Sequence, residues 1–131
     1  MARTQEELRS TVTEQPEVDR GRAIRLGVAW AIVFPLGIAL EPATNAPQPW
    51  WAAILGFGLL AGIVMTIAGL VQRKTWGLAA SLGASAILAV ASFTCPTTGH
   101  HAFGLWWFGQ FGATLALVAG SATALVRHLR A

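Results

Sequence analysis

The sequence has few charged residues: only 11% of its 131 residues are Asp, Glu, Lys or Arg, whereas soluble domains carry about 25%. That supply is too small to cover a globule of this size with a polar surface, which excludes a soluble globular protein. The chain has one cysteine, which excludes a disulfide-stabilised secreted scaffold. Its 54% content of hydrophobic residues excludes disorder over most of the length. An integral membrane protein remains.

The few charged residues lie in short stretches, and long apolar segments separate them. The four apolar segments cover approximately residues 23–40, 50–71, 76–94 and 104–126. Each is long enough for an α-helix to cross the hydrocarbon core of a bilayer, which needs about 20 residues. Unpaired backbone amides are costly in lipid, and no segment alternates as a barrel strand does. The sequence therefore predicts an all-α, integral membrane, up-and-down four-helix bundle made of two hairpins.

The positions of the basic residues predict the orientation of this bundle. All nine Lys and Arg residues fall within the first 25 residues, at Arg73 and Lys74, or after residue 126. The connections at residues 41–49 and 95–103 contain none. By the positive-inside rule, both termini face the cytoplasm from the inner (plasma) membrane, and the two connections face outward. The net charge of +3 then indicates topology and contacts with anionic lipid heads, not nucleic acid.

The chain divides into a membrane domain and two polar tails. Residues 1–22 form the predicted cytoplasmic tail, residues 23–126 the four-span domain, and residues 127–131 a second cytoplasmic tail. In the first tail, Thr4 and Glu7 have the spacing of a capping box, which predicts a short helix there.

Rows of small residues at four-residue spacing mark the helix faces that approach closely. In lipid no hydrophobic force draws helices together, so such rows predict the contact faces. The rows are Gly58, Gly62 and Thr66; Gly77, Ser81, Ser85 and Ala89; and Gly112, Ala116, Gly120 and Ala124. They predict close packing inside one bundle or docking on other subunits.

The second outward connection is the one segment with several reactive side chains. Residues 95–103 contain Cys95, His100 and His101, and the other outward connection contributes Glu41. A thiol, two imidazoles and a carboxylate are ligands for zinc or copper, so these residues are candidate metal ligands. Two alternatives stay open. In the first, the thiol is buried at a helix end and the histidines bond to loop carbonyls or to Glu41. In the second, the cysteine is redox-active or catalytic.

Four tryptophans and one glutamine are candidates for lining a cavity or an interface at the same side. These tryptophans fall near the predicted outer interface: Trp50, Trp51, Trp106 and Trp107. Their indole rings would anchor the helices there, or they would form an aromatic box for a small amphiphile. Gln110 lies one turn deeper, so its carboxamide should find a partner in the bundle or line a small outward cavity. The partners expected at that depth are Ser92, Thr94 and the carbonyl freed by Pro35.

The spans lack certain residue types, and this argues against several classes of membrane protein. No charged residue or histidine lies in the middle of a span, which argues against a proton-coupled exporter, a b-type haem bundle and a voltage sensor. No phosphate loop or serine–histidine–carboxylate set is present, so an enzyme acting alone is not expected.

The sequence favours a structural or accessory subunit that packs on other membrane proteins or on itself and requires no cofactor. The alternative is a module binding zinc, copper or a small amphiphile at the outer face. Arginine, alanine and glycine usage suggests a GC-rich bacterial genome.

Overall fold

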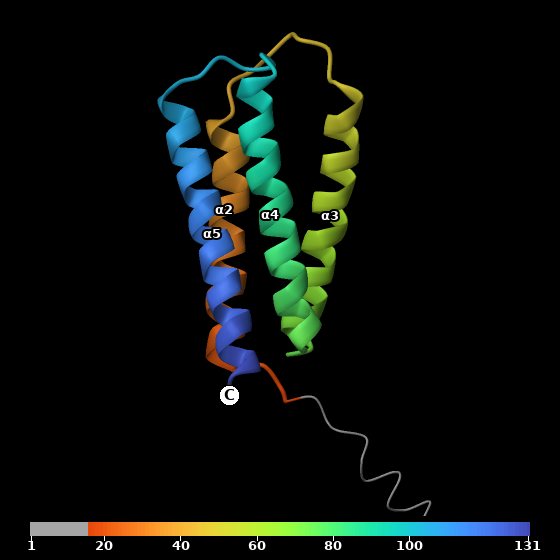
Figure 1. Cartoon of the computed structure of the whole chain (residues 1–131), viewed down its shortest axis with the longest axis vertical. Helices are drawn as coiled ribbons and strands as arrows, with labels where there is room; N and C mark the ends of the chain where they lie inside the picture. The colour runs from red at the N-terminus through yellow and green to blue at the C-terminus, as the bar shows by residue number, and fades with distance from the viewer. Residues whose placement is uncertain (1–15) are drawn as a thin grey trace, which may run out of the picture.

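The computed structural model describes residues 16–131 as four long helices (Figure 1). These are α2 (Arg20–Leu40), α3 (Trp50–Val71), α4 (Thr75–Thr97) and α5 (Leu105–Leu129). All four are long and apolar enough to cross a membrane. Within the described residues there is no strand, so the prediction of an all-α chain with four candidate spans is confirmed. The predicted helix at Thr4 and Glu7 lies outside the described residues.

The observed helix ends show where local chemistry extends the predicted spans. The bounds of α3 match the prediction. Helix α2 begins at Arg20, three residues early, because the Asp19 carboxylate caps it by accepting a hydrogen bond from the Arg22 N–H at 2.9 Å. The end of the predicted first tail is therefore the first turn of α2.

Helix α4 continues past its predicted end and through Pro96. Proline has no N–H, so the carbonyl of Ser92 loses its helical donor. The indole Nε1 of Trp107, on α5, donates to that carbonyl at 2.8 Å and replaces the missing bond. As a result Cys95 lies in the last full turn of α4, and its predicted place in the loop is wrong.

The four helices do not close into a complete ring. Helix α4 packs against both α3 and α5, and α5 packs against α2, whereas α2 and α3 touch only sparsely. Figure 1 shows α4 between α3 and α5, with α3 beside α4 near the bottom of the view and diverging from it toward the top. The bundle is therefore open along one seam, between α2 and α3.

The two ends of the bundle differ in charge. We call one the basic end; the described basic residues there are Arg20, Arg22, Arg25, Arg73, Lys74, Arg127 and Arg130. The opposite end, here the loop end, holds the connections 41–49 and 98–104, whose one charged residue is Glu41. The basic end lies at the bottom of Figure 1, beside the C-terminus.

The basic end is tightly packed. Gly69 of α3 and Gly77 of α4 lie backbone to backbone, and a Cβ added to either residue would clash with the other. Thr75 Oγ1 lies 2.9 Å from His128 Nε2, which joins the start of α4 to the end of α5. Gly77 belongs to the predicted small-residue row of α4, whereas Gly69 is not part of the row predicted for α3.

The segment before α2 also packs on the basic end. Val18 is fully buried, and its N–H donates to the Arg73 carbonyl at 2.8 Å. The Arg73 side chain returns the contact, because Nε donates to the Val18 carbonyl at 2.9 Å and Nη1 lies 3.0 Å from Glu17 Oε2. Arg73 itself has a positive φ of 56°, which turns the chain from α3 into α4.

A hydrogen-bonded chain of three side chains ties α2, α4 and α5 together in the interior. The Trp30 indole donates to Ser81 Oγ at 2.8 Å, and Ser81 Oγ lies 2.8 Å from Ser121 Oγ. All three side chains are buried. This network satisfies the only indole that sits mid-helix in α2 and places the serine face of α4 at the centre of the bundle.

Candidate functional site

A pocket of about 180 Å³ lies at the loop end, in the seam between α2 and α3. Its polar lining consists of Glu41, Ser92, Cys95 and Gln110, and aromatic walls come from Phe34, Trp51 and Trp106. We call it the loop-end pocket. The structure thus brings together five of the candidate residues that the sequence indicated: Glu41, Trp51, Cys95, Trp106 and Gln110.

Gln110 enters this pocket from the second turn of α5. A Cβ added to Gly37 of α2 would lie 3.8 Å from Gln110 Nε2, so the glycine leaves room for the carboxamide. The amide oxygen Oε1 is buried and has no hydrogen-bond partner among residues 16–131. The expected bond from this oxygen to a neighbouring helix at Ser92 or Thr94 is therefore not formed.

Ser92 is the second unpaired polar group of the pocket. The residue is only 4% exposed, and its Oγ has no partner in the described part of the chain. A buried hydroxyl or amide left without a hydrogen bond costs about 1–3 kcal/mol, and native proteins contain few of them. Two such oxygens belong to residues that line one small pocket.

Glu41 and His101 form an ion pair or hydrogen bond at the rim of the pocket. His101 Nε2 lies 2.9 Å from Glu41 Oε1, with side-chain exposures of 4% and 41%. The imidazole is buried by edge-on contacts with His100 and Trp106, at centroid distances of 4.7 and 5.8 Å. A second bond joins the same two connections, from Thr44 Oγ1 to the His100 carbonyl at 3.3 Å. This agrees with the alternative in which a histidine bonds to Glu41.

The predicted metal ligands are only partly brought together. Cys95 is half-buried and lines the pocket, whereas His101 is paired with Glu41, and the His100 ring packs against His101. Between residues 16 and 131, no group of three or more His, Cys, Asp or Glu side chains is placed to hold a metal ion. Zinc sites need three or four protein ligands, so a zinc or copper site stays a prediction without support from this geometry.

The four candidate tryptophans have different surroundings. Trp50 is 77% exposed at the start of α3, as a lipid-interface anchor would be. Trp107 bonds to α4 and stacks on Phe111 at 4.9 Å, so its role is to hold two helices together. Trp51 and Trp106 line the pocket and are the two that a bound molecule would touch.

Two important residues escaped the sequence analysis as site or network members. Trp30 carries an N–H in the middle of an apolar segment, which is itself a signal that a buried acceptor must face it. Ser92 was considered only as a partner for Gln110. Its signal was its position four residues before Pro96, where a helix carbonyl loses its donor and neighbouring helices must adjust.

Comparison of the chain with known proteins finds no relative. No family model, no curated protein and no solved structure matches it, so the functional statements below rest on its own residues.

Proposed function

We propose that the protein binds a small amphiphile at the loop end of the bundle. The observation that carries this proposal is the pair of buried, unpaired oxygens, Ser92 Oγ and Gln110 Oε1, which belong to two residues that line one pocket. A ligand head that donates to them would remove the desolvation cost of both groups. The ligand's tail would leave through the open seam between α2 and α3, where those helices touch only sparsely.

The chemistry of the lining defines the class of ligand. The pocket volume of about 180 Å³ is close to that of an engineered cavity of about 150 Å³ that binds benzene, which suggests a head of one ring. Gln110 Oε1 and the Glu41 carboxyl group offer hydrogen-bond acceptors to a ligand head. Trp51 and Trp106 supply flat apolar walls. A phenol or quinol head on an alkyl tail meets these requirements.

We further propose that the loop end faces outward, with both termini in the cytoplasm of a bacterial inner membrane. The grouping of the described Lys and Arg residues at the basic end supports this orientation under the positive-inside rule. The ligand would then enter from the outer leaflet.

The proposal is tested with the purified full-length protein and two matched probes. Binding of 4-hexylphenol and of hexylbenzene, which lacks the hydroxyl, is measured by tryptophan fluorescence in detergent. We expect the phenol to bind roughly fivefold more tightly, because its one hydroxyl donates one hydrogen bond to a buried acceptor, which contributes about 1 kcal/mol. Equal affinity for the two probes would overturn the proposal.

A pair of serine variants provides the matched control. Ser92→Ala removes a pocket hydroxyl, whereas Ser85→Ala removes a buried hydroxyl on the same helix that bonds to the Leu82 carbonyl outside the pocket. We expect the phenol affinity to fall about threefold to tenfold in Ser92→Ala and to be unchanged in Ser85→Ala. Gln110→Met should act in the same direction as Ser92→Ala.

An accessory-subunit role is the second candidate, and one face of α5 favours it. Gly112, Ala116 and Gly120 of the predicted small-residue row are exposed, and a Cβ added to either glycine would meet nothing within 4 Å. The corresponding row on α4 is buried at Gly77, Ser81 and Ser85. Apart from the buried Ala124, the α5 row is therefore exposed among residues 16–131 and suits the close approach of another membrane helix.

The subunit role is tested by the size of the complex extracted from native membranes. Gly120→Leu adds a bulky side chain to the exposed α5 row and should reduce the complex to the mass of the single chain. Gly83→Leu adds the same side chain to another glycine with open space, outside the row, and should leave the complex intact. A wild-type chain that is extracted alone would remove this candidate.

A further inference from the structure

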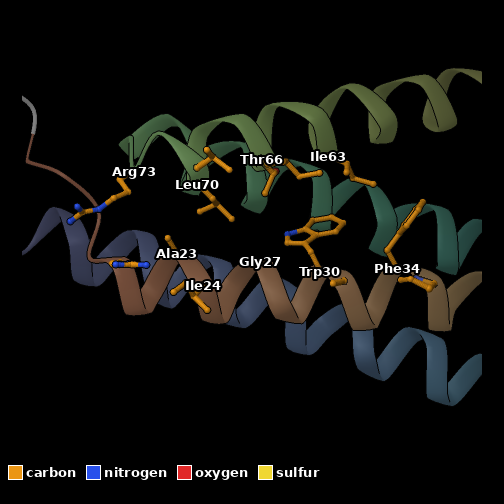
Figure 2. A pocket seen from close by; sticks show the side chains of 14 residues that line it. Ala23, Ile24, Gly27, Trp30, Phe34, Ile63, Thr66, Leu70 and Arg73 are labelled. Atoms are coloured by element: carbon orange, nitrogen blue, oxygen red, sulfur yellow. The ribbon is translucent and has the colours of Figure 1, made fainter.

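A second cavity, separate from the loop-end pocket, lies between α2 and α3 in the half of the bundle nearer the basic end (Figure 2). Its volume is about 600 Å³. Its walls are almost wholly apolar, with Ile24, Gly27 and Trp30 on α2 facing Ile63 and Leu70 on α3. We call this cavity the α2–α3 groove.

The groove has a charged end and an apolar end. Arg20 and Arg73 are its only charged lining residues, and both are positive. Figure 2 shows Arg73 at one end of the groove and Phe34 and Ile63 toward the other. The Arg73 side chain is held in place by Val18 and Glu17, while Arg20 is exposed in the first turn of α2.

The groove's dimensions correspond to one leaflet of a bilayer. From Arg20 to Phe34 the α2 backbone rises about 21 Å, at 1.5 Å per residue. Half of a typical hydrocarbon core is about 15 Å thick, so a groove of this length runs from the headgroup level to the middle of the membrane. Basic residues at the mouth would then lie at the level of lipid phosphates.

We propose that the α2–α3 groove binds an anionic phospholipid of the leaflet at the basic end. One acyl chain lies along the apolar walls, and the phosphate lies between the guanidinium groups of Arg20 and Arg73. The exposed Arg20 guanidinium can bind phosphate oxygens in a planar, bidentate manner, which gives the site its preference for an anionic head. Arg73 adds positive charge at the same end, although its Nε and Nη1 already contact Val18 and Glu17. A second copy of this chain would bring an apolar helix that leaves Arg20 without a counter-charge, since Arg73 already contacts Glu17.

The binding of this lipid does not depend on the proposed amphiphile site. The two cavities share Phe34 as a lining residue, but their polar groups are different: Arg20 and Arg73 here, Ser92 and Gln110 at the loop end. Loss of one ligand therefore leaves the other measurable.

The proposal is tested by native mass spectrometry of the full-length protein in detergent. Palmitoyl-oleoyl phosphatidylglycerol and the phosphatidylcholine with the same acyl chains are added in equal amounts. We expect the wild type to retain one phosphatidylglycerol, at about fivefold or greater preference over phosphatidylcholine. Equal retention of the two lipids would overturn the proposal, as would a protein dimer that excludes lipid from the groove.

Two glycine variants distinguish lipid binding in the groove from lipid binding elsewhere on the surface. A Cβ at Gly27 meets nothing within 4 Å, so Gly27→Leu folds without a clash while its side chain fills the groove. We expect this variant to lose the bound phosphatidylglycerol. Gly83→Leu makes the same change at another open position and should retain the lipid, with helicity and melting temperature measured for both. Unchanged retention in Gly27→Leu would contradict the proposed site.

Two arginine variants, which carry the same net charge as each other, test the phosphate contact. Arg20→Gln removes a residue that lines the groove. Arg127→Gln removes a basic residue of α5 at the same end, which lines a different cavity, between α2 and α5. We expect the preference for phosphatidylglycerol to fall about fivefold in Arg20→Gln and to stay unchanged in Arg127→Gln. Equal losses in the two variants would indicate attraction by the overall charge and would overturn the assignment to this groove.

Discussion

Two serines on one face of α4 have opposite environments. Ser81 and Ser92 are eleven residues apart, which is about three turns, so both point to the bundle interior. Ser81 Oγ accepts a bond from Trp30 and contacts Ser121, whereas Ser92 Oγ has no partner in the described residues. The first serine joins helices and the second lines a pocket. A buried polar residue is thus structural where its partners are present and a candidate binding group where they are missing.

The same difference separates the two ends of the hairpin formed by α3 and α4. At the basic end the helices meet through the backbones of Gly69 and Gly77. Toward the loop end they diverge, as Figure 1 shows, and the loop-end pocket extends between α2 and α3 onto the face of α4. The tight end holds the helices in place, and the divergent end leaves space for a ligand.

The largest loss of stability is expected from Gly69→Ala, at the tight end. The added methyl would clash with the Gly77 backbone, which cannot move aside as a flexible side chain would. We expect a loss of about 3 kcal/mol, the upper range for overpacking, measured by unfolding in mixed detergent micelles. The control is Gly83→Ala, which meets nothing and should gain up to about 1 kcal/mol through helix propensity. A Gly69→Ala protein as stable as the wild type would contradict the backbone contact.

A smaller loss is expected from Ser81→Ala, which breaks the polar chain between α2, α4 and α5. The variant leaves the buried Trp30 N–H without its acceptor and should lose about 1–2 kcal/mol of unfolding free energy. The double variant with Trp30→Phe should lose less than the sum of the two single variants, because each removes the same bond. Additive losses would show that the two side chains act independently.

Glu41→Gln should have a smaller effect again. It weakens the contact with the nearly buried His101 imidazole, and we expect a loss of about 1 kcal/mol or less, measured by thermal unfolding. Glu17→Gln weakens the more exposed pair with Arg73 at the opposite end and should cost no more than about 0.5 kcal/mol. A larger effect for Glu17 than for Glu41 would reverse the expected ranking of the two ion pairs.

No loss of stability is expected from Ser92→Ala, despite its burial on the same face as Ser81. Removing a hydroxyl that has no partner eliminates a desolvation cost, so the ligand-free protein should be unchanged or more stable by about 1 kcal/mol. The same thermal unfolding measurement applies. A loss equal to that of Ser81→Ala would show that Ser92 is a structural hydrogen-bonding residue, and would remove the basis for the loop-end pocket as a binding site.

The sequence predicted the helices well and their ends less well. The bounds of α3 follow directly from its apolar run between Pro49 and Gln72. The end of α4 did not follow, because the donor that lets the helix pass through Pro96 is the indole of Trp107, which reaches it only in the folded bundle. Cys95 was misplaced for the same reason.

The sequence predicted which residues line the candidate site, but it did not predict which of them bond to one another. Glu41, Cys95, Trp51, Trp106 and Gln110 do line one pocket, since they come from turns at the same end of the bundle. The pairing of His101 with Glu41 was one of several arrangements compatible with the sequence. The choice depends on how Trp106 and His100 bury the imidazole, which is a matter of side-chain packing.

The sequence by itself determined the four apolar helices, the grouping of basic residues at one end and the rows of small residues along α3, α4 and α5. These properties depend on composition and helical periodicity, which are local. The tertiary structure alone decided which rows are used: the α4 row is buried, whereas most of the α5 row is exposed. It also decided which of two similar serines finds a partner. Periodicity specifies which residues share a helix face, but only the packing of other helices decides what each face meets.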